Sequence, residues 1–155
     1  SKALARLNEM FRLGQVKKTY WAIVKNKPEQ EEGELVHWLV RNEKQNKSYA
    51  YDTERPGAKQ AILHYRLIAS SDRYYLLEID LKTGRHHQIR CQLARMGCPI
   101  KGDLKYGFER SNRDGGISLH ARSAALIHPV SKQSLYIEAP VPDDPLWRAL
   151  AAAVK

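Results

Sequence analysis

The sequence predicts an α+β domain, a mixed but mainly antiparallel sheet with helices packed against it. Three observations lead to this fold class. Most apolar residues alternate with polar ones, which is typical of half-buried strands. Short polar loops separate these alternating segments, and short connections favour antiparallel pairing. A helical period appears only near the start, in the middle and at the end of the chain.

The first elements are a helix and two strands. Apolar residues recur at helical spacing over residues 4–11, and strict alternation then predicts a strand over residues 16–24. The polar stretch 26–34 is expected to form a surface loop, because it is rich in glutamate and contains Pro and Gly. A second strand is expected over residues 35–40.

The middle of the chain is predicted to be a meander of antiparallel strands. Polar stretches at 43–48 and 52–57 interrupt it, and the longest strands are expected over 58–69 and 74–81. Only the short loop 70–73 joins those two strands, so they are expected to pair with each other. The residues available for one face of this pair are Ile62, Tyr65, Leu67, Tyr75, Leu77 and Ile79.

The last part returns to helix and strand patterns. Ile89, Leu93 and Met96 form a helical stripe that ends at Gly97. Strands are then expected over 117–128 and 133–139. Two aspartates precede an alanine-rich closing helix, where the helix dipole favours negative charge. We expect one domain spanning residues 1–155.

Composition points to a polyanionic partner. The chain carries 26 Lys and Arg against 17 Asp and Glu, a net charge of +9, and nucleic acid is the expected partner. An acidic membrane surface is the rival, but no apolar run approaches the ~20 residues of a membrane span, and no signal peptide is recognisable. We therefore expect a cytoplasmic protein. The two cysteines, Cys91 and Cys98, are expected to be half-buried thiols.

Positive charge concentrates between residues 82 and 113. This segment has eight Lys or Arg and only two acidic residues, Asp103 and Glu109. Its glycines would let phosphates approach the backbone, and guanidinium groups fork onto phosphate oxygens. The alternative is an ordinary solvated face of a basic protein.

No motif for a cofactor or a metal stands out. His86 and His87 are adjacent, so they are expected to point to different sides of a helix start and not to chelate one metal. No nucleotide-binding glycine loop and no nucleophile elbow are present. If the protein is an enzyme, we expect it to use neither ATP nor a metal.

Four segments, in order, resemble the RluA-type pseudouridine synthases. The stretch 81–90 (LKTGRHHQIR) and the stretches 97–103 and 105–107 resemble the TGR-x-HQIR, G-x-PI-x-GD and YG block of that family. Residues 18–24 (KTYWAIV) resemble its K-x-Y-x-A-I-V strand. The Leu-His-Ala string at 119–121, with a later His-Pro, resembles a further strand. The resemblance covers residues 1 to 148.

The resemblance implies the pseudouridine synthase fold and an isomerase that detaches uracil from ribose and reattaches it through carbon, without cofactor or metal. The substrate would be structured RNA, ribosomal or transfer RNA. Tyr20 matches the family tyrosine that stacks on uracil, and Arg90 matches the arginine that pairs with the catalytic aspartate. The remaining basic or polar positions expected to contact RNA are Lys82, Arg85, His87, Gln88, Lys101, Lys105 and Tyr106. For Arg85 and Gln88, the alternative role is to hold the turn. For His87, the alternative is a structural role as a hydrogen-bonding residue.

One departure from the family pattern bears on activity. The catalytic aspartate of the family lies in an H-R-L-D segment, and no such string occurs here. Asp80 and Asp103 are not expected to replace it. We therefore expect a partial catalytic domain whose N-terminal part, with the nucleophile, is missing, which is inactive alone and exposes a sheet edge or an apolar patch. Arg90 would then pair with a carboxylate that lies outside this chain. The alternative is a noncatalytic RNA-binding domain that uses residues 82–113.

Overall fold

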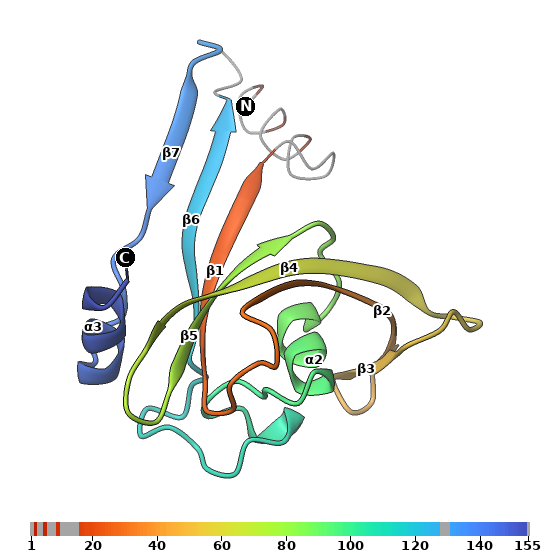
Figure 1. Ribbon diagram of the computed structural model, residues 1–155. Helices are drawn as coiled ribbons and strands as arrows, with labels where there is room; N and C mark the ends of the chain where they lie inside the picture. The colour runs from red at the N-terminus through yellow and green to blue at the C-terminus, as the bar shows by residue number, and fades with distance from the viewer. Residues whose placement is uncertain (1, 3–4, 6–8, 10–15, 128–130, 155) are drawn as a thin grey trace.

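A single seven-stranded sheet organises the molecule (Figure 1). The structure, a computed structural model, describes residues 2, 5, 9, 16–127 and 131–154. The strand order is β3-β2-β4-β5-β1-β6-β7, and every neighbouring pair is antiparallel. The predicted α+β class is confirmed.

The described elements follow the predicted order. The strands are β1 (Lys17–Val24), β2 (Glu32–Asn42), β3 (Lys47–Tyr51), β4 (Lys59–Ser70), β5 (Tyr75–Leu81), β6 (Leu119–Ile127) and β7 (Ser134–Glu138). The helices are α2 (Gln88–Arg95), the short 3₁₀ helix η1 (Leu104–Tyr106) and α3 (Pro145–Ala152). The helix expected over 4–11 falls almost entirely outside the described residues. No helix in the described part is long and apolar enough to cross a membrane.

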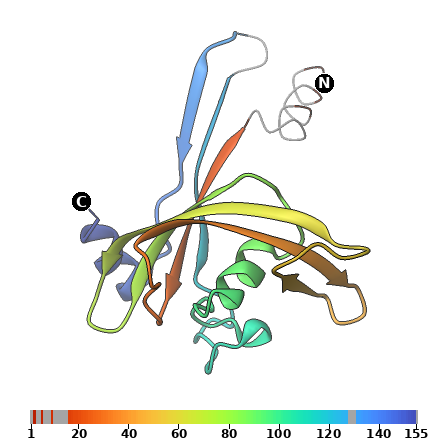
Figure 2. The ribbon, with the colours of Figure 1, turned by 45° about the vertical axis from the view of Figure 1, so that its right-hand side comes forward.

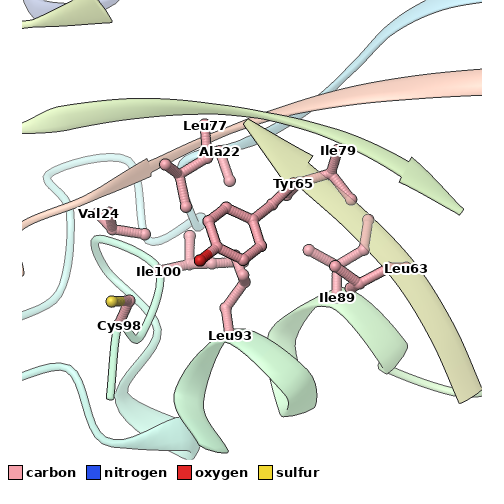
Figure 3. Close-up of a cluster of buried hydrophobic side chains, with 10 residues drawn as sticks. All are labelled: Ala22, Val24, Leu63, Tyr65, Leu77, Ile79, Ile89, Leu93, Cys98 and Ile100. Carbon is pink, nitrogen blue, oxygen red and sulfur yellow. The ribbon is translucent and has the colours of Figure 1, made fainter. Parts of the chain in front are cut away.

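Helix α2 packs under the curved strands β2 and β4 on one face of the sheet (Figure 2). Ile89 and Leu93 project from α2 toward Tyr65 and Ile79 in the largest buried cluster (Figure 3). We call this cluster the α2-side core; its members are Ala22, Val24, Leu63, Tyr65, Leu77, Ile79, Ile89, Leu93, Cys98 and Ile100. Both cysteines are free thiols and buried.

The opposite face of the sheet packs on α3. Because side chains alternate along a strand, Trp21 and Ile23 of β1 point away from α2 and pack with Leu76, Trp147 and Leu150. Helix α3 begins where predicted, because the carboxylate of Asp144 accepts hydrogen bonds from the amides of residues 146 and 147 at 3.0 and 3.1 Å.

Two details of the strand prediction are corrected. β2 begins at Glu32, inside the segment expected to be a loop, because residues 32–34 pair through their backbones with residues 64–66 of β4. Ile62 does not share the face of Tyr65. The core face of β4 carries Leu63 and Tyr65, and Ile62 lies on the other face, as the period of two requires.

Strand β7 forms an exposed edge of the sheet. Every residue of β7 is exposed, and β6 and β7 project as a ribbon away from the rest of the sheet (Figure 1). Tyr136 and Ile137 keep 65% and 59% of their surface exposed, and Ile127 of β6 keeps 53%.

Candidate functional site

The turn between β5 and α2 is held by Gln88, whose side chain is inside it. Gln88 is only 3% exposed. Its Oε1 accepts hydrogen bonds from the Thr83 hydroxyl at 2.8 Å and from the amide of Arg85 at 2.9 Å. Its Nε2 donates to the carbonyl of Ile62 and to the Gln92 side chain. The expected contact of Gln88 with RNA is corrected by this burial, and Gln88 takes its alternative role in the turn.

Arg90 is paired with a carboxylate of this chain. Its Nε and Nη2 donate to the two carboxylate oxygens of Asp103, both at 2.8 Å. The Asp103 side chain is 1% exposed, and the Arg90 side chain is 21% exposed. Hydrogen bonding to Asp103 raises the pKa of Arg90. The expectation that the partner of Arg90 lies outside the chain is therefore corrected, although the guanidinium still reaches the surface.

His87 links this ion pair to Tyr106. The Nη1 of Arg90 lies 3.1 Å from His87 Nε2, and arginine can only donate, so Nε2 is an acceptor. His87 Nδ1 therefore carries the hydrogen and donates to the Tyr106 hydroxyl at 2.8 Å. Burial, followed by the charge of Arg90, lowers the pKa of His87 to about 4. His87 is therefore neutral, and it accepts a hydrogen bond from the Arg90 nitrogen that Asp103 does not contact.

The Tyr106 hydroxyl is also engaged from β3. It accepts a hydrogen bond from the backbone amide of Ser48 at 2.9 Å, and the Tyr106 side chain is largely enclosed. The Arg90 guanidinium lies 5.0 Å from the centre of the ring. The expected contact of Tyr106 with a phosphate stays a prediction, because the hydroxyl accepts both of these hydrogen bonds and keeps its own hydrogen to donate.

The two histidines lie together. His87 has a left-handed backbone, with φ of 52°, at the start of α2. The ring of His87 stacks on that of His86, with centroids 3.8 Å apart and planes 23° from parallel. The expectation that they point to different sides is therefore wrong. A hydrogen bond also joins His86 Nδ1 to the Ser48 hydroxyl at 2.9 Å.

Tyr20 lies on the same face of the sheet as α2. Its half-buried ring packs against the α2-side core, to which Ile89, the neighbour of Arg90, belongs. Within the described residues, the Tyr20 hydroxyl makes no hydrogen bond and no ring contact joins it to Arg90. Asp80 lies on the opposite face, where it accepts a hydrogen bond from the Thr19 hydroxyl at 3.1 Å, so it is removed from Tyr20 and Arg90.

The other basic residues expected to contact RNA divide into two groups. Lys82, Arg85 and Lys105 are exposed. The Arg85 Nε donates to the Gln60 carbonyl at 2.9 Å, and the Lys105 ammonium donates to the carbonyls of residues 45 and 46. Lys101 is half-buried and donates to the Asn112 side chain at 2.6 Å. Lys101 lines a pocket of about 560 Å³, together with Trp147 and Asp144, and neither Arg90 nor Tyr20 lines this pocket.

Sequence reasoning missed the structural partners of this site. From the sequence, Asp103 is weighed only as a substitute for the nucleophile, whereas in the structure it is the buried partner of Arg90. Ser48 contributes an amide to Tyr106 and a hydroxyl to His86. No sequence pattern points to Ser48. Ser48 and Tyr106 are 58 residues apart in the sequence, so their contact depends on the tertiary fold.

Comparison with known proteins matches the chain to one family. The family model for RNA pseudouridylate synthase matches residues 1–95. An uncharacterized RNA pseudouridine synthase of Bacillus subtilis is 34% identical over 149 residues, covering 92% of this chain and 46% of the relative. A protein of Vibrio vulnificus named tRNA pseudouridine synthase C is 30% identical over 168 residues, covering 97% of this chain and 67% of the relative.

A solved structure agrees with these sequence relatives. Human RNA pseudouridylate synthase domain containing 4 superposes with a TM-score of 0.70 and 25% identity, over 90% of this chain and 63% of the human one. The chain spans about half the length of the Bacillus subtilis relative, and 62% of a relative from Zymomonas mobilis.

Proposed function

The chain belongs to the RNA pseudouridylate synthase family, and from this membership we propose that the protein isomerises uridine to pseudouridine in structured RNA, ribosomal or transfer RNA, in the cytoplasm. In that reaction the bond from ribose C1′ to uracil N1 breaks, the ring turns and a bond from C1′ to C5 forms. The hydrogen of C5 leaves as a proton and N1 takes up a proton, so that substrate and product are isomers. The relative named tRNA pseudouridine synthase C supports a transfer RNA substrate.

Two residues of this chain take roles in the proposed reaction. The face of Tyr20 stacks on the extruded uracil, a contact worth ~1–3 kcal/mol per base. Arg90 orients the catalytic aspartate of the family. Three of the five N–H groups of Arg90 are used by Asp103 and His87, so two remain to donate to a second acceptor. We assign the role of the nucleophile neither to Asp103, which Arg90 already engages, nor to Asp80 on the opposite face.

The observation that carries this proposal is the shared face of Tyr20 and Arg90. The residues that match the tyrosine and the arginine of the family lie on different elements, β1 and α2, which are far apart in the sequence. Both elements meet in the α2-side core, where Tyr20 packs against the cluster that includes Ile89, the neighbour of Arg90, so the two elements lie on the same side of the sheet.

The test measures tritium release from RNA labelled at C5 of uridine, with variants in the full-length protein. We expect activity from the natural protein and a loss of at least about 100-fold in Arg90→Ala and Tyr20→Ala. Arg95→Ala is the matched control, because Arg95 lies on the same helix but pairs with exposed Asp52. Circular dichroism checks that each variant is folded. RNA binding without any tritium release would instead support a noncatalytic RNA-binding domain.

A further inference from the structure

A second pocket lies beside the Arg90 site, between β2, β3, the start of β4 and the turn before α2. Its volume is about 290 Å³. The residues that line it come from four separate segments: Leu39, Arg41, Ser48, Gly57, Lys59, Gly84, Arg85 and His86. We call it the β2–β4 pocket. Neither Arg90 nor Tyr20 lines it, so it is distinct from the site above.

The lining of the β2–β4 pocket is positive and unneutralised. Arg41, Lys59 and Arg85 are all exposed, and no carboxylate lines the pocket. Among the residues that the structure describes, none of these three cations has an acidic partner within salt-bridge distance. Elsewhere on the surface, Arg66 and Arg95 are paired, with Glu78 and Asp52 respectively. Three unpaired cations around one hollow favour a bound anion.

The geometry of the lining suits an oxygen-rich anion. Because Arg85 Nε is fixed on the Gln60 carbonyl, its position is restrained and its terminal nitrogens remain available. At Gly57 and Gly84, a Cβ atom would meet nothing within 4 Å, so open space lies directly over the backbone. Burial and then the charge of Arg41 lower the pKa of His86, which agrees with a positive local potential.

The β2–β4 pocket touches the Arg90 site through one shared wall. Ser48 lines the pocket, and its amide donates to the Tyr106 hydroxyl of the Arg90 network. His86 also lines the pocket, and its ring stacks on His87, which braces Arg90. A group held in the pocket therefore lies next to Tyr106 and His87, the residues that contact Arg90.

We propose that the β2–β4 pocket binds a backbone phosphodiester of the substrate RNA, close to the target uridine. This rests on the proposed function, because RNA is the polyanion that would bring a phosphate and a uracil to adjacent places at once. Each phosphate contact by Lys or Arg releases counterions and makes affinity depend on salt. The pocket thus positions the RNA and contributes no base recognition.

The test uses Arg41→Ala, Lys59→Ala and the double variant in the full-length protein. Neither side chain has a described ion-pair partner whose loss would unfold the protein. The probe is a single-stranded oligouridylate of about ten nucleotides, with binding followed by fluorescence anisotropy at several salt concentrations. We expect each single variant to weaken binding by roughly 3- to 10-fold and to lower the slope of log affinity against log salt by about one.

Arg73→Ala is the matched control, because Arg73 is exposed in the loop after β4, at the opposite end of that strand from Lys59. We expect its affinity and salt slope to match those of the natural protein. Competition with UMP and inorganic phosphate forms a second arm. Displacement of the probe by either small anion as effectively as by unlabelled oligouridylate would identify a small-anion site and overturn the proposal.

The outcomes also separate this proposal from the proposed function. Unchanged binding and salt slope in the double variant, with normal tritium release, would overturn the phosphate site and leave the isomerase standing. Weakened binding in the variants, with no tritium release by the natural protein, would support the phosphate site and overturn the isomerase.

Discussion

Arg90 and Asp103 form an ion pair in which each charge compensates the other away from solvent. The carboxylate is enclosed and both of its oxygens accept from one guanidinium, so the pair is a bidentate ion pair in a largely dry place. Removing one partner of such a pair leaves the other charge without compensation. The cost of breaking the buried pair can therefore be compared with the cost of breaking an exposed pair made by Arg95 of the same helix.

Asp103→Asn is expected to lower the free energy of unfolding by about 3 kcal/mol, because it leaves Arg90 without a counter-charge. Urea denaturation monitored by circular dichroism measures this. Asp52→Asn is the matched control, since Asp52 pairs with Arg95 of the same helix and the two side chains are 67% and 48% exposed. Its expected cost is under about 1 kcal/mol. Equal costs for the two variants would contradict the structural role of the buried pair.

His87 predicts a pH dependence of stability. Its pKa is about 4 in the folded protein and 6.5 ordinarily, so between those values the unfolded chain binds a proton that the folded one does not. The free energy of unfolding should be at its maximum above about pH 6.5 and fall as the pH drops toward 4. The full shift corresponds to about 3 kcal/mol, and solvent screening at this partly exposed ring makes the expected loss smaller.

His87→Asn removes that titration and is compatible with a left-handed backbone. Its stability should fall less steeply between pH 6.5 and 4.5 than that of the natural protein. Some slope should remain, because burial also lowers the pKa of His37 and His86. An unchanged slope would show that His87 is not held neutral by its surroundings.

The loop that carries Asp103 is shaped by Gly102. Gly102 has φ of 87°, and a Cβ there would lie 2.5 Å from the Asn112 side chain. That side chain in turn bonds the carbonyl of Gly116 at 2.9 Å and the Ser118 hydroxyl at 3.1 Å. The loop therefore closes around a position that tolerates no side chain, and this closure places Asp103 under α2.

Gly102→Ala should be more destabilising than Gly115→Ala, by at least about 1 kcal/mol. Both glycines have left-handed backbones, so both variants include that strain. A Cβ at Gly115 meets nothing within 4 Å, so only Gly102→Ala adds a collision with Asn112. Thermal unfolding of the two variants measures the difference, and equal shifts in the midpoint would exclude the collision.

Most elements could be predicted because their patterns are local. The alternation in β1, the stripe of α2 and the acidic cap of α3 are each set within about ten residues of sequence. The start of β2 could not be predicted from the sequence, because residues 32–34 are polar and join the sheet only through their backbones. The Arg90–Asp103 pair was missed for a related reason, since spacing alone does not show which loop closes on which helix.

Across the whole sheet, the protection of backbone amides from hydrogen exchange should depend on the position of the strand in the sheet. β5 lies between β4 and β1 and supplies Leu76, Leu77 and Ile79, which are completely buried. β7 is an edge strand with every residue exposed. Hydrogen exchange followed by mass spectrometry should therefore be slowest in β5 and at least about 100-fold faster in β7. Equal protection in the two strands would contradict this order.

Ser48 has a consequence for how the two neighbouring sites respond to ligands. It lies on β3, an edge strand that pairs only with β2 among the described strands, and it touches Tyr106 on one side and His86 on the other. If a ligand on each side favours the same position of Ser48, the two ligands favour the same arrangement of this strand. By thermodynamic linkage, each ligand then raises the affinity for the other by the same factor, and the two would bind cooperatively.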